Sequence, residues 1–154
     1  MFEKILVCLD GSSFAEHILP YAMEQARHFG SKIVLLRVLP TFPAMSKTIG
    51  EPELVAEVAE PEDITNKEAK AMAYVEGVIA YLEERGLNAE GVFIKGSPEE
   101  AIVAYAGQHD IDLIALATHG HSGLGRVVCG SVADYVLKES GIPVLAIRPK
   151  ESES

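Results

Sequence analysis

Residues 113–131 contain four glycines between two stretches of different character. The segment reads LIALATHGHSGLGRVVCGS, and its glycines are Gly120, Gly123, Gly125 and Gly130. Because glycine lacks a Cβ, backbone N–H groups can turn toward one point there, and a ligand can approach the chain closely. An apolar run precedes the loop, and a helical pattern starts at Ser131. A strand, a glycine-rich loop and a helix N-terminus in this order are typical of phosphate binding.

Five short apolar runs predict the strands that must position this loop. They lack polar alternation, which is typical of strands buried on both faces. They cover residues 4–9, 32–38, 92–94, 113–117 and 144–147. Helical patterns lie between them, and capping boxes predict that three helices begin directly after Ser13, Thr65 and Ser97. Alternating strands and helices predict an α/β fold, in which a parallel sheet carries helices on both faces.

Composition and charge exclude several classes of partner. The 154 residues carry a formal net charge of −10, whereas proteins that bind nucleic acid or anionic membranes usually present a basic face. Only Cys8 and Cys129 occur, so no disulfide framework is expected. The N-terminus shows no signal-peptide pattern, and no apolar run is long enough to span a bilayer. We therefore expect a cytoplasmic protein that binds neither nucleic acid nor a membrane.

The glycine loop resembles the nucleotide-binding motif of the universal stress protein family, in its ATP-binding type. That motif has three glycines, with two residues between the first and the second and nine between the second and the third. A Ser or Thr follows the third glycine. Here Gly120 and nine further residues lead to Gly130 and Ser131, and Ala117 stands in place of the first glycine. The resemblance extends from KILVCLDGSS to GIPVLAIRP. It implies one universal stress protein-like domain over residues 1–149, followed by a polar tail over 150–154.

The resemblance implies a doubly wound, Rossmann-like fold, with a five-stranded parallel sheet in the order 3-2-1-4-5. Ligands of such sheets bind beyond the carboxyl ends of the strands, where the strand order reverses. That point lies between the first and fourth strands, so Asp10 is expected beside the glycine loop. The family resemblance places ATP there, together with Mg²⁺. The expected binding residues are Asp10, Val38, Ala117, His119, Gly120, Gly123, Arg126, Gly130, Ser131 and Val132.

The expected roles follow from the chemistry of each group. Backbone N–H groups of the loop and of the last helix would hold the phosphates, with Ser131 adding a hydroxyl donor. The resemblance places adenine against Val38. Asp10 could accept hydrogen bonds from ribose hydroxyls or coordinate Mg²⁺, although Asp-Gly is also a common turn pair.

Several residues of the loop have a plainer interpretation beside the functional one. His119 and His121 could form a metal pair, but two histidines on a loop are more typical of solvated or phosphate-facing side chains. Arg126 could contact a phosphate or be a surface cation near a helix end. Cys129 could be a redox switch at a helix N-terminus, or a small buried apolar residue.

Two functions of different classes remain open. The first is a nucleotide-binding regulatory module of the stress response, which passes its state to a protein partner. The alternative is a dimeric stress-response interaction protein that binds no nucleotide. Because the motif offers no positioned base or Lys, we expect slow ATP hydrolysis at most.

Two further segments carry expectations about assembly and access. The last strand, Val144–Ile147, is wholly apolar and ends the sheet, which predicts a homodimer formed through that edge. Residues Pro40–Asp63 form a long segment without a clean period, which predicts a loop that covers the site and holds a short helix at Glu53–Glu60.

Overall fold

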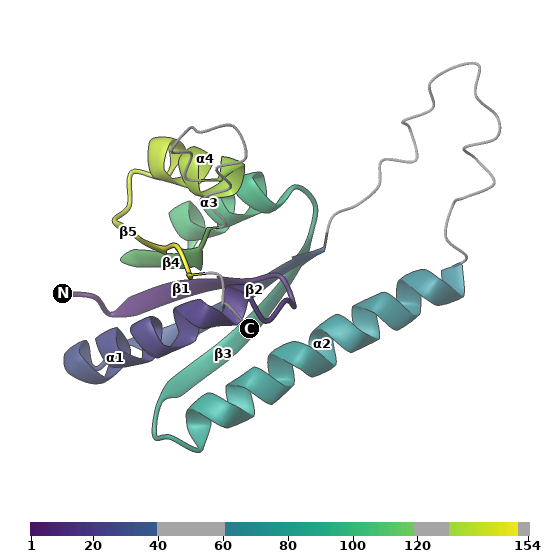
Figure 1. The fold of residues 1–154 in the computed structure, drawn as a ribbon, viewed down its shortest axis with the longest axis horizontal. Coiled ribbons are helices and arrows are strands. Elements are labelled where there is room, and N and C mark those ends of the chain that lie inside the picture. The colour runs from purple at the N-terminus through teal and green to yellow at the C-terminus, as the bar shows by residue number, and fades with distance from the viewer. Residues whose placement is uncertain (40–60, 119–129, 151–154) are drawn as a thin grey trace.

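The computed structural model describes residues 1–39, 61–118 and 130–150 (Figure 1). The strands are β1 (Lys4–Leu9), β2 (Lys32–Leu39), β3 (Asn88–Lys95), β4 (Leu113–Ala117) and β5 (Val144–Ile147). The helices are η1 (Ala15–Ile18, a 3-10 helix), α1 (Leu19–Phe29), α2 (Pro61–Glu83), α3 (Pro98–Gln108) and α4 (Ser131–Glu139). Among the described helices none is long and apolar enough to cross a membrane.

The five strands form one parallel sheet in the order β3-β2-β1-β4-β5. This confirms the predicted doubly wound α/β fold. β1 lies at the centre, where Ile5 pairs with Ile33 of β2 on one side and with Leu113 of β4 on the other. The chain leaves β1 toward one edge and later returns to the other, so the strand order reverses between β1 and β4.

Helices cover both faces of the sheet, and alternate strand residues serve the two faces. Ile5, Val7 and Leu9 of β1 belong to a core cluster with residues of α1 and α2. Leu6 belongs to a second cluster with residues of α3 and α4, against which Cys8 packs. Figure 1 shows α1 and α2 on one side of the strands, and α3 and α4 on the other.

The first helical segment differs from its prediction in both its start and its cap. Its first turn is the 3-10 helix η1, and α1 begins only at Leu19. The hydroxyl that accepts the Ala15 N–H is that of Ser12, at 3.1 Å, and not that of Ser13. Pro20 lies in the first turn of α1, where its missing N–H costs no helical hydrogen bond.

Helix α2 begins earlier than the sequence predicts. It starts at Pro61, so the Thr65–Glu68 pair lies inside the helix and residues 61–63 are helical. The rest of the Pro40–Asp63 prediction, including the helix at Glu53–Glu60, lies outside the described residues. The helix buries Val75 and Leu82 against the sheet and approaches β3 closely, because a Cβ on Gly91 would lie 2.5 Å from Cγ1 of Val75.

Strand β3 is longer than the predicted run of residues 92–94. It begins at Asn88, and exposed Asn88 and Glu90 flank buried Ala89. β3 is an edge strand, so its residues meet solvent more often than those of the central strands. A search for unbroken apolar runs therefore detects only its end.

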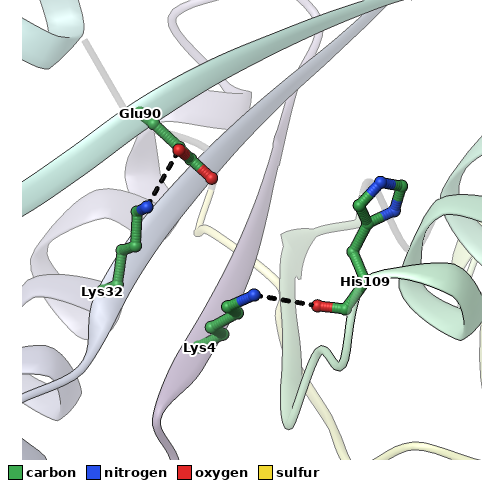
Figure 2. Close-up of polar contacts among 4 residues, drawn as sticks. All are labelled: Lys4, Lys32, Glu90 and His109. Atoms are coloured by element: carbon green, nitrogen blue, oxygen red, sulfur yellow. Dashed lines mark hydrogen bonds and ion pairs between the residues drawn. The ribbon is translucent and has the colours of Figure 1, made fainter.

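Polar contacts hold the amino-terminal ends of the strands. Figure 2 shows the ion pair between Lys32 of β2 and Glu90 of β3, at 2.9 Å, and the hydrogen bond from Lys4 Nζ to the His109 carbonyl, at 3.3 Å. Asp112 Oδ2 accepts the N–H groups of Glu3 and Lys4, at 2.9 and 3.0 Å. These contacts link the start of β1 to the segment between α3 and β4, and β2 to the edge strand β3.

Candidate functional site

A cavity of about 340 Å³ lies at the carboxyl ends of the central strands. This volume falls in the range of small-molecule pockets, roughly 300–1,000 Å³. The cavity meets β1, β2, β4 and the start of α4, so it occupies the point where the strand order reverses. Its lining consists of Cys8, Leu9, Asp10, Phe14, Ala15, Leu36, Val38, Pro98, Ile102, Leu116, Ala117, Thr118, Gly130, Ser131, Val132 and Ala133.

The wall of the cavity on the sheet side is apolar. Leu36, Val38 and Leu116 are buried residues of the core cluster between the sheet and α3 and α4. Cys8 lies beside them, and burial raises the pKa of its thiol to about 12. At neutral pH the thiol is therefore protonated and uncharged, and it adds to an apolar surface that suits a flat aromatic group.

One carboxylate stands at the rim. Asp10 is exposed, and its Oδ1 accepts both the N–H and the hydroxyl of Ser12, at 2.8 and 2.5 Å. The Ser12 oxygen in turn accepts the Ala15 N–H at 3.1 Å, so the turn after β1 is joined to η1. Two bonds to Oδ1 fix the carboxylate and leave Oδ2 as the oxygen that is open to a ligand hydroxyl.

The N-terminus of α4 reaches the cavity without a side-chain cap. The Asp134 N–H bonds the Gly130 carbonyl at 3.0 Å and opens the helical ladder. The N–H groups of the preceding three residues belong to the first turn, where an α-helix offers them no acceptor. With the positive end of the helix dipole, they make this the part of the cavity that favours an anion.

Gly130 is required by the backbone at this point. Its φ is 54°, and a Cβ added there would lie 2.7 Å from Oγ1 of Thr118, which is itself buried. A side chain would therefore strain the backbone and displace Thr118. The glycine lets the end of β4 and the start of α4 meet closely at the cavity.

The structure brings six of the ten predicted binding residues to this one cavity. They are Asp10, Val38, Ala117, Gly130, Ser131 and Val132. The other four, His119, Gly120, Gly123 and Arg126, lie outside the described residues, as do His121 and Cys129.

The predicted binding residues leave out the other lining residues, among them Phe14, Pro98 and Ile102 from outside the sheet. Pro98 starts α3, directly after β3, so the rule that ligands meet the carboxyl ends of strands offers a signal for it. Phe14 follows the Asp10 turn, which offers a weaker signal. Ile102 has none, because its apolar type suits an ordinary core position equally well.

A metal site has little support from the described part of the chain. No group of three His, Cys, Asp or Glu side chains gathers there in a way that could hold a metal ion. Asp10 is the only carboxylate among the described lining residues.

Strand order, a cavity at the reversal point and an uncapped helix N-terminus define a doubly wound α/β domain with a ligand pocket. The chain belongs to the universal stress protein family, whose family model matches residues 1–148. It is 30% identical to universal stress protein MJ0577 of Methanocaldococcus jannaschii, over 99% of this chain and 98% of that protein. The solved structure of MJ0577 superposes with a TM-score of 0.65 and covers 99% of both chains. The structure of universal stress protein UspA from Lactobacillus plantarum superposes with a TM-score of 0.73 at 24% identity. The match covers 96% of this chain and 98% of that one.

Some solved relatives of the family contain adenine nucleotides. One universal stress protein from Archaeoglobus fulgidus was solved with dAMP, at 22% identity and a TM-score of 0.67, covering 96% of this chain and all of that one. A family member from Arabidopsis thaliana was solved with AMP, at 19% identity and a TM-score of 0.66. The match covers 96% of this chain and 92% of that one. At these identities the likeness establishes the fold, and the nucleotides are properties of those proteins.

Proposed function

We propose that this protein is a nucleotide-binding regulatory module of the cytoplasmic stress response, and that it holds an adenine nucleotide, ATP in particular. One observation carries the proposal: an apolar wall, a fixed carboxylate and a helix N-terminus without a side-chain cap surround one cavity of the described residues. These three features match the base, the sugar and the phosphates of a nucleotide. The nucleotide complexes of related proteins support the same ligand class.

The arrangement of the lining residues suggests how such a ligand would lie. Adenine would rest on the apolar wall near Val38, and the ribose hydroxyls would donate to Oδ2 of Asp10. The phosphates would accept N–H groups from Ser131 and Val132 at the start of α4. Residues 119–129 would complete the phosphate contacts, as the glycine motif predicts, and Mg²⁺ would bind between the phosphates and Asp10.

The same lining favours holding a nucleotide over cleaving it. Among the described lining residues no Lys or His occurs, and the only carboxylate, Asp10, already accepts two hydrogen bonds from Ser12, so it is a poor base toward water. We therefore expect bound ATP to be hydrolysed slowly at most. A protein whose bound nucleotide persists can signal its state to a partner protein.

Mass spectrometry of the purified protein after denaturation tests the proposal. We expect adenine nucleotide to be released in an amount close to one per chain, or to bind when ATP and Mg²⁺ are added back. Thermal unfolding with and without ATP is the second measurement, because a ligand that binds only the folded state raises the melting temperature. If no nucleotide is released and ATP leaves the melting temperature unchanged, the interaction protein that binds no nucleotide becomes the better hypothesis.

The edge strand β5 favours a homodimer, with or without nucleotide. Its four residues carry no charge, and Val144, Leu145 and Ile147 are only partly buried although they pair with β4. An apolar edge of this kind is a template for pairing with another chain. Two copies of β5 related by a twofold axis would run antiparallel. Light scattering at micromolar concentration should give the mass of a dimer, and a monomer there would contradict this part of the proposal.

A further inference from the structure

Two buried polar atoms on the face opposite the cavity have no hydrogen-bond partner within the described residues. They are Nε of Arg37 and the hydroxyl of Tyr74. Arg37 alternates along β2 with the cavity residues Leu36 and Val38, so its side chain lies on the α1 and α2 face. Native proteins rarely leave such atoms unpaired, and an exception calls for an explanation.

Arg37 touches both chain segments that carry the predicted base and sugar contacts. A Cβ on Gly11 would lie 3.2, 3.5 and 3.6 Å from its Nη2, Cζ and Nε atoms. Three nearly equal distances mean that the guanidinium group lies flat against Gly11. On its other side Nη1 donates to the Val38 carbonyl at 3.3 Å.

This contact begins where the sheet ladder ends. The last paired residues of β1 and β2 are Leu9 and Arg37. Beyond them, Asp10 and Gly11 leave the sheet, and no strand hydrogen bond holds them at a fixed distance from Val38. The guanidinium group contacts both Gly11 and the Val38 carbonyl from the α1 and α2 face of the sheet. Gly11 makes this possible, because its φ of 86° and its lack of a side chain let the turn lie on the guanidinium plane.

The surrounding charges favour a cation in this position. Burial raises the pKa of Tyr74, the nearby carboxylates of Glu16 and Asp10 raise it further, and Arg37 lowers it. Arg37 therefore stands as the cation among acidic groups that come from the Asp10 turn and from η1.

We propose that Arg37 is a positioning residue for the nucleotide site, which holds the Asp10–Ser12 turn and the Val38 carbonyl in place from the far side of the sheet. The inference rests on the proposed function of the cavity. Arg37 is absent from the described lining, so it acts through Asp10 and Val38 and does not touch the ligand. Its role is to set the separation between the carboxylate and the apolar wall.

The first experiment compares Arg37→Met with Arg85→Met, each titrated with AMP and with adenosine by calorimetry. Arg85 is a matched control: it is exposed, it also donates to a backbone carbonyl, that of Tyr81 at 2.9 Å, and its loss changes the net charge equally. We expect Arg37→Met to weaken both ligands about tenfold and Arg85→Met to weaken either less than about twofold. Equal loss for the two ligands is the mark of positioning, because adenosine carries no phosphate.

Two results of this experiment would overturn the proposal. If Arg37→Met weakens AMP but not adenosine, the guanidinium acts on the phosphate through its charge. If Arg37→Met and Arg85→Met lose affinity for both ligands to the same extent, the loss comes from the change in net charge. Arg37→Lys serves as a second variant should the Met variant fold poorly: it keeps the charge and loses the flat contact, so we expect it to resemble Arg37→Met in affinity.

The second experiment uses no nucleotide and separates the two proposals. Amide hydrogen exchange by NMR should be about fivefold faster in Arg37→Met for Ser12 and Ala15, whose N–H groups bond within the turn. The Lys32 N–H, which bonds the Glu3 carbonyl at the other end of the strands, is the internal control and should not change. If wild-type protein binds neither ligand, the proposed function fails; unchanged exchange at Ser12 and Ala15 would overturn the role of Arg37 itself.

Discussion

The two ends of the sheet are built from the same strands but satisfy their polar groups very differently. At the amino-terminal end, Asp112, Lys4 and the Lys32–Glu90 pair have partners within hydrogen-bond or ion-pair distance. At the carboxyl end lie the cavity, the N-terminus of α4 without a side-chain cap, and Arg37 Nε, which has no hydrogen-bond partner among the described residues.

This difference separates stability from binding. The amino-terminal contacts join segments that are distant in sequence and offer nothing to a ligand. At the carboxyl end the first N–H groups of α4 have no side-chain cap, and a nucleotide could satisfy them, which is the usual trade between stability and function at a site. Substitutions at one end should therefore leave the property of the other end unchanged.

The largest expected effect comes from a charge placed at the cavity, in Ser131→Asp. A carboxylate about 4 Å from a phosphate costs on the order of 4 kcal/mol at an effective dielectric near 20. Because Ser131 is exposed, solvent should screen about half of this, which leaves roughly a 30-fold loss of AMP affinity. The ligand-free protein should be equally or slightly more stable, because an acidic residue in the first turn of α4 suits the helix dipole.

Isothermal titration and thermal unfolding of the same samples check this prediction. Ser131→Asn is the control, with a similar shape and no charge, and it should bind AMP within about threefold of wild type. Adenosine should lose less affinity than AMP in the Asp variant. Undiminished AMP binding in that variant would mean that phosphate does not lie at the start of α4.

The second effect concerns the amino-terminal end, in Asp112→Ala. The carboxylate accepts two backbone N–H groups, so its loss should cost about 1–2 kcal/mol of unfolding free energy. For a domain of this size that lowers the melting temperature by roughly 3–8 °C. AMP affinity, measured well below the melting temperature, should stay within about twofold of wild type.

Asp112→Asn keeps one acceptor oxygen and should recover part of the lost stability. Urea unfolding gives the free energies, and titration with AMP gives the affinities. A clear loss of affinity in Asp112→Ala would show that the two ends are coupled, contrary to the comparison above.

The smallest effect is expected from Ala117→Gly, which restores the glycine of the family motif. Ala117 borders the cavity but also packs against the core cluster on the α1 face. Its methyl group therefore serves the core, and we expect AMP affinity to change less than about threefold, with a stability loss of about 0.5–1 kcal/mol. Titration and urea unfolding measure both. A gain in affinity of tenfold or more would instead identify the methyl group as an obstacle to the ligand.

The sequence predicts the bounds of three strands correctly because each is an apolar run with sharp ends. β1, β4 and β5 have the predicted bounds, since unbroken apolar runs can hardly be anything else at that length. Capping boxes were less reliable: Ser12 and not Ser13 bonds the first turn, and α2 begins before Thr65. Where two neighbouring residues both carry a hydroxyl, as Ser12 and Ser13 do, the motif does not say which hydroxyl caps the helix. Tertiary contacts decide that.

The site was predictable where topology fixes it. Asp10 and Ala117 had to meet because both end strands that the family order makes neighbours. Arg37 could not be found in this way, because its importance depends on the face it occupies and on the last pair of the β1–β2 ladder. Its residue type alone is equally typical of a surface cation at a strand end.

The central position of β1 also bears on how the protein is made. Lys4 pairs with Lys32, which is synthesised only a short time after it. Ile5 pairs on its other side with Leu113, which is synthesised much later. The β1–β2–β3 half can therefore assemble during synthesis, and closing the long loop to β4 comes late and costs more chain entropy. Because the cavity needs β4 and the start of α4, it is among the last parts of the fold to form on the nascent chain.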